Sequence, residues 1–364
     1  MKLSDLCYFL DSEIPLSFQE GYDNSGIQLG QAGQEITSAL ITLDVTEEVI
    51  DEAVQKGCDI IISHHPLIFK GIKKITGRSS TDRIITKAIK NDIAVYSAHT
   101  NLDMVNNGVS KKMAQKLGLQ NIRVITPLKN RLLKLVTFIP EDHLDKVREA
   151  IFKAGAGHIG NYDNCGFSVS GTGSFRAGEG TNPFSGQLGK IHFGKEIRFE
   201  TIIFSHLQEA VLKALLESHP YEEVAYDLYP IENQNIEAGL GCTGDFKEPT
   251  EEKDFLNLIA SVFGATGLRY SRLTGRAVKK VALCGGSGSG LLNDAISAGA
   301  DAFVTGDIKY HTFFEADDRI LIVDCGHFES EKFSTEILYD LINKKFPKFA
   351  IRFSETNTNP INYL

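Results

Sequence analysis

Three segments of the chain carry histidines and acids of the kinds that bind metal ions, and each follows a predicted strand. They are Ser63-His64-His65-Pro66, His99-Thr100-Asn101-Leu102-Asp103 and His327-Phe328-Glu329-Ser330-Glu331. Imidazole and carboxylate groups together suit Zn, Mn, Fe or Co better than Mg or Ca, which prefer shells made only of oxygen. Because these segments hold more such groups than one ion needs, we predict a site for two divalent metal ions.

Two neighbouring ions would equip the protein for hydrolysis, because a pair of ions can activate water and stabilise both the attacking and the leaving oxygen. Alternate residues of an extended chain point in opposite directions, so His64 and His65 could each reach one ion. Asp103 or Glu331 could bridge or cap the ions. His99 has two alternative roles, as a ligand or as a residue that orients Asp103.

A fourth segment, residues 305–311, follows another predicted strand and contains Asp307 and His311. These two are candidate catalytic residues, because they could contact a substrate or act as acid and base. A capped turn is the alternative interpretation. Residues 285–290 are rich in glycine but lack the Lys-Ser/Thr pair of a phosphate-binding loop, so we interpret them as a turn between a strand and a helix.

Composition and charge narrow the class of protein. With 364 residues the chain exceeds the usual size of a single hydrophobic core, so two domains are expected. The net charge of -9 argues against a nucleic-acid surface, and no apolar run approaches the ~20 residues needed to cross a membrane. The six cysteines include no C-x-x-C pair, and the N-terminus shows no signal peptide, so a cytoplasmic location is expected.

The outer parts of the chain repeat one plan, in which apolar strands alternate with helices. Strands are predicted at residues 39–45, 59–63 and 93–97, and again at 280–284, 301–305 and 320–324. Fully apolar strands indicate an α/β layer covered by helices on both faces. Asp59 and Asp301 hold equivalent places in this repeat, and the later strands align His99 with His327. We therefore predict two similar α/β halves, with a chance match of two α/β patterns as the alternative.

The middle of the chain follows a different pattern. Strands are predicted near 133–138, 199–204 and 223–229, and helices near 144–151 and 207–216. Two strand-helix-strand units of this kind suggest a ferredoxin-like α+β domain. Residues 171–186, which are rich in Gly, Asn, Pro and Ser, are predicted to form a loop. The predicted metal-binding domain is therefore discontinuous, built from residues 1–127 and 239–364, with the small domain inserted at residues 128–238.

Five motifs of the chain resemble the dinuclear-metal-centre family of type 2 GTP cyclohydrolase homologues, which includes the Nif-three-like proteins. They are Asp23-Asn24-Ser25-Gly26, Ser63-His64-His65-Pro66, Ser97-Ala98-His99-Thr100-Asn101-Leu102-Asp103, Thr305-Gly306-Asp307-Ile308-Lys309-Tyr310-His311 and Gly326-His327-Phe328-Glu329-Ser330-Glu331. The outer parts match this family throughout, with Tyr22 standing where many members have Trp. The segment that begins at His219 resembles the longer members, whose extra domain is similar to the PII and CutA type of ferredoxin-like fold.

The resemblance implies five metal ligands and a toroidal homohexamer whose metal sites face an internal cavity. The implied ligands are His64, His65, Asp103, His327 and Glu331. It also implies a metal-dependent hydrolase resembling GTP cyclohydrolase 1 type 2, with a nucleotide as the substrate. Two alternatives stay open, namely a metal-dependent phosphoesterase and a non-enzymatic metal-binding or regulatory hexamer.

Overall fold

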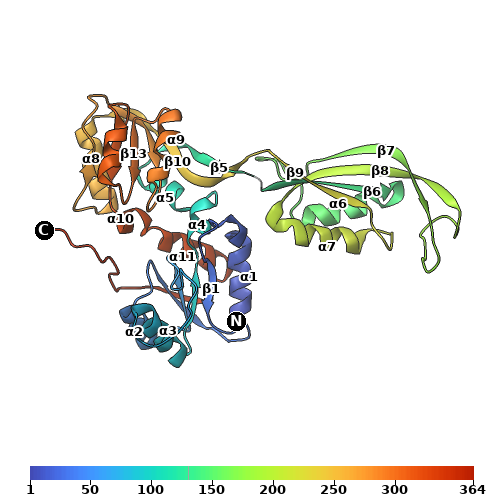
Figure 1. Cartoon of the computed structure of the whole chain (residues 1–364), viewed down its shortest axis with the longest axis horizontal. Coiled ribbons are helices and arrows are strands. Elements are labelled where there is room, and N and C mark those ends of the chain that lie inside the picture. Colours follow the sequence, from blue (N-terminus) through green and yellow to red (C-terminus); the bar gives the residue numbers. More distant parts are fainter. Residues whose placement is uncertain (130) are drawn as a thin grey trace. The chain divides into compact units, whose positions relative to one another are not determined.

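The structure is a computed structural model that describes residues 1–129 and 131–364, apart from the side chains of residues 236 and 237. Its contacts separate two compact units: unit 1 is Met1–Pro127 with Glu237–Leu364, and unit 2 is Leu128–Ile236. Both units contain helices and strands (Figure 1), which confirms the predicted mixed α/β class. In the part of the chain that the structure describes, no helix has the length and apolar character needed to span a membrane.

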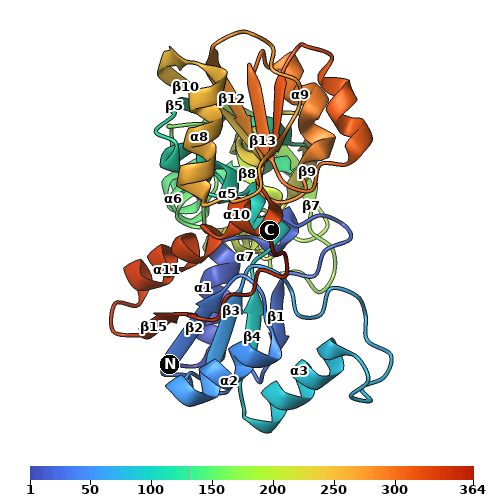
Figure 2. The same cartoon turned by 90° about the vertical axis from the view of Figure 1, so that its left-hand side faces the viewer.

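The first sheet of unit 1 has the strand order β1-β4-β3-β2-β15. Its strands are β1 (Gly26–Leu29), β2 (Ser38–Thr42), β3 (Ile60–Ser63), β4 (Ala94–Ser97) and β15 (Ala350–Phe353). The accompanying helices are α1 (Leu3–Glu13), α2 (Glu47–Lys56), α3 (Ser80–Lys90) and α11 (Ser334–Lys345). Strands β15, β2, β3 and β4 are parallel, and β1 runs antiparallel to β4. Leu40, Ile61 and Val95 pack against α2 and α3, while the opposite face packs against α1 and α11 (Figure 2).

The second sheet of unit 1 has the strand order β11-β14-β13-β12-β10-β5. Its strands are β5 (Gln120–Leu128), β10 (Asn235–Thr250), β11 (Arg269–Tyr270), β12 (Val278–Leu283), β13 (Ala302–Thr305) and β14 (Leu321–Asp324). The accompanying helices are α5 (Val109–Lys116), α8 (Glu252–Phe263) and α9 (Leu292–Ser297). Strands β12, β13 and β14 are parallel. Ala282 and Phe303 pack against α9, while Leu283 and Val304 face the side of α5 and α8.

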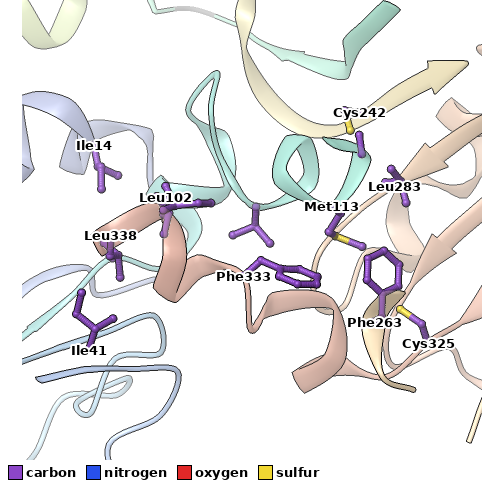
Figure 3. Close-up of a cluster of buried hydrophobic side chains, with 14 of the residues drawn as sticks. Ile14, Ile41, Leu102, Met113, Cys242, Phe263, Leu283, Cys325, Phe333 and Leu338 are labelled. Atoms are coloured by element: carbon purple, nitrogen blue, oxygen red, sulfur yellow. The ribbon is translucent and has the colours of Figure 1, made fainter. Parts of the chain in front are cut away.

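One hydrophobic core joins the inner faces of the two sheets of unit 1. Figure 3 shows Ile41 and Leu338 on the side of the first sheet and Leu283 on the side of the second, with Met113 and Phe333 among the residues between them. Side chains of this core are close to fully buried, and truncating one such large side chain to alanine typically costs roughly 2–5 kcal/mol. The shared core therefore fixes the two sheets of unit 1 against each other and brings the ends of their strands together.

Local sequence explains where α2 begins and ends. The Thr46 hydroxyl accepts a hydrogen bond from the Val49 N–H at 3.3 Å, and Glu47 and Glu48 lie in the first turn, near the positive end of the helix dipole. Gly57 ends the helix with a φ of 65°, a left-handed conformation that glycine adopts without strain. Residues next to the helix in sequence therefore set both of its ends.

Asp59 and Asp301 make the same backbone bonds in the two sheets. Each carboxylate accepts the N–H groups of two successive residues at or next to the start of the neighbouring strand, at distances of 2.6 to 3.1 Å. Each residue also donates its own N–H to that strand, Asp59 to the Ser38 carbonyl and Asp301 to the Lys280 carbonyl. These bonds anchor β3 and β13 at matching positions.

The same anchors correct one predicted alignment. Ser97 pairs with the last residue of β3, and Asp324 pairs with the last residue of β13, so these two residues correspond. His99 then corresponds to Gly326, and the predicted alignment of His99 with His327 is wrong by one residue. The sequence alone could not fix this alignment, because the register depends on backbone pairing.

Unit 2 has the element order β-α-β-β-α-β. Its elements are β6 (Leu132–Pro140), α6 (Leu144–Lys153), β7 (Gly166–Arg176), β8 (Ile191–Phe204), α7 (Gln208–Ser218) and β9 (Tyr226–Ile231). The strand order is β7-β8-β6-β9, and neighbouring strands are antiparallel. Both helices lie on one face of this sheet (Figure 1), where Val147 and Ile151 of α6 and Leu215 of α7 are buried with Phe199 of β8. The helix predicted near residues 144–151 is confirmed as α6.

The loop predicted at residues 171–186 is wrong in its first part. Residues 171–176 continue β7, which pairs with β8 from Gly166 opposite Thr201 to Arg176 opposite Ile191. Residues 171–176, Gly-Thr-Gly-Ser-Phe-Arg, lack the apolar-polar alternation that indicates a strand, and most side chains of β7 are exposed. Pairing with the long strand β8 decided the conformation instead.

Glu52 of α2 holds the segment that follows β15. Its carboxylate accepts hydrogen bonds from the Ser354 hydroxyl at 2.6 Å, the Glu355 N–H at 2.8 Å and the Thr356 hydroxyl at 2.7 Å. Burial alone would raise the pKa of Glu52, but these bonds and the Lys56 ammonium together lower it from 4.5 to about 2. The ionised carboxylate is therefore the form that stabilises the fold.

We predict that Glu52→Gln lowers the free energy of unfolding at neutral pH by roughly 1–3 kcal/mol, because several donors lose a charged acceptor. Since the pKa is lower in the folded state, this stabilisation is complete above the unfolded value of 4.5 and disappears as the pH falls toward about 2. Denaturant unfolding of the metal-free proteins should therefore show a difference in unfolding free energy between wild type and Glu52→Gln near neutral pH. This difference should be smaller near pH ~3. Glu355→Gln is the control, because that side chain is 86% exposed; an equal difference at both pH values would contradict the prediction.

Candidate metal centre

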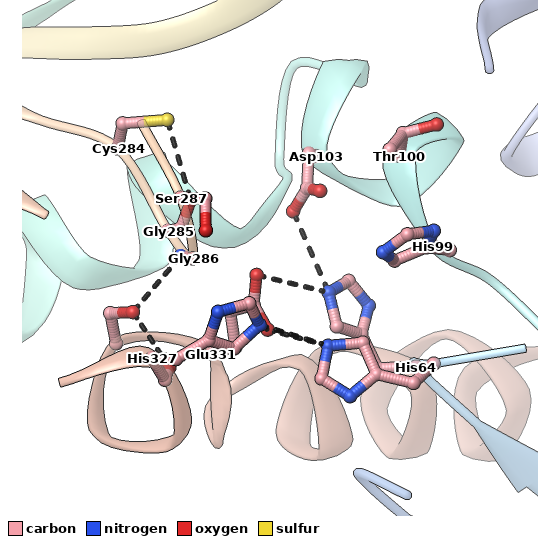
Figure 4. Close-up of polar contacts among 12 residues, drawn as sticks. His64, His99, Thr100, Asp103, Cys284, Gly285, Gly286, Ser287, His327 and Glu331 are labelled. Carbon is pink, nitrogen blue, oxygen red and sulfur yellow. Dashed lines mark hydrogen bonds and ion pairs between the residues drawn. The ribbon is translucent and has the colours of Figure 1, made fainter. Parts of the chain in front are cut away.

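The carboxyl ends of three parallel strands deliver the predicted ligands to one place in unit 1. His64 and His65 directly follow β3, and Asp103 lies on the short helix α4 (Thr100–Met104), which follows β4. His327 and Glu331 are the first and last residues of α10 (His327–Glu331), which follows β14. Figure 4 shows the Glu331 carboxylate directed toward the histidine rings. This convergence matches the general rule that ligands of open α/β sheets bind beyond the carboxyl ends of the strands.

One group of donors is His64 with Asp103 and Glu331. The His64 Nε2 atom lies 3.8 Å from the Asp103 Oδ1 atom and 3.8 Å from the Glu331 Oε1 atom. These separations are too long for hydrogen bonds. His64 Nε2 and Asp103 Oδ1 are buried, and neither has a hydrogen-bond partner among the described residues. Buried polar atoms left unpaired in this way are typical of a site that awaits a further partner.

The second group is His65 with His327 and the other oxygen of Glu331. The Glu331 Oε2 atom lies 2.8 Å from His65 Nε2 and 2.9 Å from His327 Nε2, and the two Nε2 atoms are 3.2 Å apart. Donor atoms of His64, His65 and Glu331 all lie within 4.8 Å of one another. Glu331 therefore offers one carboxylate oxygen to each group.

The Nδ1 atom of each of these three histidines is bound to a separate acceptor, which directs the Nε2 atom toward the centre. The pairs are His64 with the Ala98 carbonyl, His65 with Asp44 and His327 with Asp307, each at 2.7 Å. Metal-binding histidines are commonly fixed in this way, because the outer bond sets both the tautomer and the ring orientation. In all three rings Nε2 is thus the atom that faces Glu331.

Asp44 was not singled out in the sequence. It lies two residues after the end of β2, at the same sheet edge as the His64-His65 pair, and its second oxygen accepts a hydrogen bond from the Thr358 hydroxyl at 2.8 Å. An acid just after one strand, with two histidines just after the next, was the signal that could have identified it.

Asp307 and His311 lie in different surroundings. The Asp307 carboxylate binds the His327 ring and accepts a hydrogen bond from the Ser287 hydroxyl at 2.5 Å. His311 is exposed, and its contacts among the described residues are with the rings of Tyr310 and Phe314. Asp307 therefore joins the cluster by binding the His327 ring, while the structure does not bring His311 to it. Proton transfer by either residue stays a prediction.

His99 lies beside both groups of donors. Its ring centre is 5.4 Å from those of His64 and His65, and its Nδ1 atom binds the Asp23 carboxylate at 2.7 Å. Asp23 also accepts hydrogen bonds from the N–H and the hydroxyl of Thr100. Burial would raise the pKa of Asp23, but these bonds hold it well below its usual range. The contact of His99 is thus with Asp23, and none of its described contacts is with Asp103.

A glycine makes room for the shared carboxylate. Gly286 has a φ of 59°, and a Cβ atom there would lie 2.0 Å from Glu331 Oε1. The N–H of Gly286 binds the Ser330 hydroxyl at 3.0 Å, which ties this turn to α10. The glycine-rich segment joins β12 to α9, as its sequence indicated, and here it also lines the metal centre.

The pKa values of the ligands reflect close pairing in a buried place. Burial would lower the pKa of His65 and of His327, but bonds to Asp44 and Glu331 raise that of His65 to about 10, and Glu331 and Asp307 raise that of His327 to about 9. Burial would raise the pKa of Glu331, but the histidines hold it well below its usual range. Protons and a divalent ion compete for the same Nε2 atoms, so ion binding releases protons.

Comparison with known proteins identifies relatives along the whole chain. Residues 1–360 match the model of the Duf34/NIF3 (NGG1p interacting factor 3) family. The chain is 41% identical over 356 residues to a Halalkalibacterium halodurans protein named GTP cyclohydrolase 1 type 2 homolog, covering 96% of this chain and 95% of that protein. A Bacillus subtilis protein of the same name is 40% identical over 357 residues, with the same coverage of both chains.

Solved structures give the same result. A Bacillus cereus protein related to NIF3 superposes with a TM-score of 0.88 at 39% identity, covering 100% of this chain and 99% of that one. A Staphylococcus aureus protein superposes with a TM-score of 0.79 at 30% identity and the same coverage. The match of family model, sequence and fold over nearly the full length establishes that the chain belongs to the Duf34/NIF3 family.

Proposed function

We propose that this protein binds two divalent metal ions and hydrolyses a nucleotide, with opening of the GTP purine ring as the first reaction to test. The observation that carries the proposal is Glu331, a buried carboxylate that presents one oxygen to each of two groups of histidine and carboxylate donors. The printed name of the relatives, GTP cyclohydrolase 1 type 2 homolog, supports the choice of GTP.

The donors fit two ions of the Zn, Mn, Fe or Co type. His64, Asp103 and Glu331 would hold one ion, and His65, His327 and Glu331 the other. The unpaired, buried Nε2 of His64 and Oδ1 of Asp103 support this assignment, because leaving a buried polar group without a partner costs roughly 1–3 kcal/mol. Two such ions supply an activated water and stabilise negative charge on the reacting oxygens.

Residues around the ligands have positioning roles in this proposal. Asp44 and Asp307 orient the rings of His65 and His327 through their Nδ1 atoms. His99, held by Asp23, lies beside the donors with its ring partly exposed, so it can contact a bound substrate or act on a proton there. His311 could reach a substrate only from outside this cluster, and it keeps the role of a candidate acid or base.

Two exposed aromatic side chains near His99 favour a substrate with a flat ring. Tyr22 is 67% exposed and Phe69 is 42% exposed, and their ring centres are 6.3 Å apart. The Phe69 ring lies edge-on to His99 with the centres 6.0 Å apart. The Asn24 amide donates to the Ile68 carbonyl at 2.6 Å and so fixes the Phe69 segment. Aromatic faces beside the donors suit a purine better than a plain phosphoester.

The finer organisation is proposed on the same basis. The matching bonds of Asp59 and Asp301 support a metal-binding domain built from two similar halves, residues 1–127 and 239–364. The β-α-β-β-α-β order with antiparallel neighbours supports a ferredoxin-like domain inserted at residues 128–238. A toroidal homohexamer and a cytoplasmic location rest on the family resemblance.

A nucleotide panel tests the activity directly. Full-length protein loaded separately with Mn, Zn, Fe or Co would be incubated with GTP, other nucleoside triphosphates and nucleoside monophosphates. Formate release from GTP supports ring opening. Release of phosphate or of a nucleoside monophosphate instead indicates a phosphoesterase, and no turnover with any metal contradicts the enzymatic proposal and favours a metal-binding or regulatory role.

We predict that the protein binds two ions per chain and that substitutions in the two donor groups reduce the ion content to different extents. His64→Ala and His327→Ala should each retain about one ion, because each removes a donor from one group only. Glu331→Gln should weaken both ions, since each carboxylate oxygen belongs to a different group. Metal analysis after dialysis measures the content, and His311→Ala, which lies outside both groups, is the control. A single ion in the unaltered protein would contradict the two-ion proposal.

We predict opposite effects of Asp103→Asn on metal binding and on stability. Metal content should fall, because the charge of one ligand is lost. The metal-free variant should be more stable than the metal-free wild type by roughly 1–3 kcal/mol, because burial opposes the charge on Asp103 and its Oδ1 atom is unpaired. Denaturant unfolding after chelator treatment measures this, with the exposed Asp142→Asn as the control. Lower stability of the metal-free Asp103→Asn protein would refute the prediction.

We predict that Phe69→Ala raises KM by up to about tenfold with little change in kcat, because a stacking contact contributes about 0.5–1.5 kcal/mol to ring binding in ground and transition states alike. The substrate is whichever nucleotide the panel identifies. Tyr8→Ala, an exposed ring on α1, is the matched control. If KM and metal content are both unchanged in Phe69→Ala, Phe69 does not contact the substrate.

A further inference from the structure

Unit 2 contains a cavity that the proposed metal chemistry does not use. Its volume is about 460 Å³, which lies within the range of small-molecule sites. It opens beside the β7–β8 hairpin, whose strands run on past the end of β6 (Figure 1). Four aromatic side chains line it, namely Phe138, Phe175, Phe184 and Tyr221.

Three of these aromatic side chains, Phe175, Phe184 and Tyr221, form a connected group of rings. The Tyr221 ring centre lies 5.8 Å from that of Phe184 and 6.4 Å from that of Phe175. The Arg198 guanidinium already lies over the Phe138 ring, with its carbon 6.0 Å from the ring centre. The walls of this cavity therefore offer π-faces of the kind that attract cations.

A carboxylate is built into the wall of the cavity. Glu196 accepts a hydrogen bond from the Tyr221 hydroxyl at 2.8 Å. A Cβ atom on Gly173 would lie 2.0 Å from the Glu196 Oε2 atom, so the absence of a side chain at Gly173 makes room for this carboxylate. Glu196 is thus held in one orientation before any ligand binds, which reduces the entropy lost on binding.

A second carboxylate fixes the segment that carries Phe184. Both oxygens of Glu222 accept the Asn182 N–H, at 2.9 and 3.2 Å. The connection between β7 and β8 is therefore tied to the segment before β9, and Phe184 is brought against Tyr221. These bonds therefore fix one wall of the cavity.

We propose that this cavity binds a small organic cation with an apolar or aromatic body. Three carboxylates line it, those of Glu196, Glu222 and Glu223, against the single guanidinium of Arg176. This excess of negative charge, next to aromatic faces, attracts an ammonium or guanidinium group and disfavours an anion. The site lies entirely in unit 2, so it is a second binding function, independent of the metal centre and of any hydrolytic activity.

Indole probes can test the proposal on the full-length protein, because the chain contains no tryptophan that would contribute background fluorescence. Tryptamine, tryptophol and indole-3-acetate share an indole ring and differ mainly in carrying a cation, a neutral hydroxyl or an anion. Fluorescence anisotropy at neutral pH gives a dissociation constant for each. We expect tryptamine to bind about tenfold more tightly than tryptophol, with indole-3-acetate weakest.

Variants then locate the binding. Glu196→Gln keeps the shape and can still accept the Tyr221 hydrogen bond, so it should lose most of the preference for tryptamine over tryptophol while both still bind. Phe184→Ala should weaken both probes. Glu179→Gln, an exposed acid outside the cavity, controls for the negative charge of the chain as a whole. No tryptamine binding at millimolar concentration, equal affinity for the three probes, or an unchanged preference in Glu196→Gln would overturn the proposal.

Discussion

The arrangement of unit 1 depends on one buried carboxylate, that of Glu331, which is 4% exposed and shared among His64, His65 and His327. An ionised carboxylate in such a place is strongly unfavourable unless positive or hydrogen-bonding groups surround it. His65 and His327, whose pKa values are raised by their bonds to Glu331 and to Asp44 and Asp307, supply those groups in protonated form, and divalent ions would supply the same compensation. The elements that carry these histidines therefore have to come together at the Glu331 carboxylate.

Residues that do not contact the Nε2 atoms of the histidines also hold this arrangement in place. Asp44 orients His65 and is itself bound by the Thr358 hydroxyl, which lies in the C-terminal segment. The same segment is fixed further back by Glu52 on α2, and further on by the Asn359 amide, which donates to Glu329 of α10 at 3.0 Å. The last residues of the chain thus brace a histidine of β3 and the helix that carries Glu331.

The two sheets of unit 1 have the same aspartate anchors but different residues after the anchored strands. Asp59 and Asp301 anchor β3 and β13 with the same bonds, yet β3 leads into two histidines whereas β13 leads into Gly306 and Asp307. The glycine is required because a Cβ atom at position 306 would lie 2.9 Å from the backbone of His327. One sheet supplies ligands at this position, and the other supplies space and an orienting carboxylate.

The sequence by itself determined the mixed α/β class, the helix limits at Thr46 and Gly57, and the residue types gathered at strand ends. These features follow from short-range chemistry: apolar runs, capping side chains and the imidazole and carboxylate groups themselves. Residue types and positions after strands pointed to a metal site, while the choice of five ligands came from the family resemblance. Asp44 was missed because it comes close to His65, which follows β3, only when the chain folds.

Only the tertiary structure decided which atoms meet. Three features depend on backbone pairing between segments far apart in the sequence. They are the sharing of Glu331 by two donor groups, the contact of His99 with Asp23, and the register in which Gly326 of one sheet corresponds to His99 of the other. Residues 171–176 became a strand for the same reason, since β8 provided a partner that local composition could not indicate. Residue types are local properties, whereas register and burial arise from contacts across the fold.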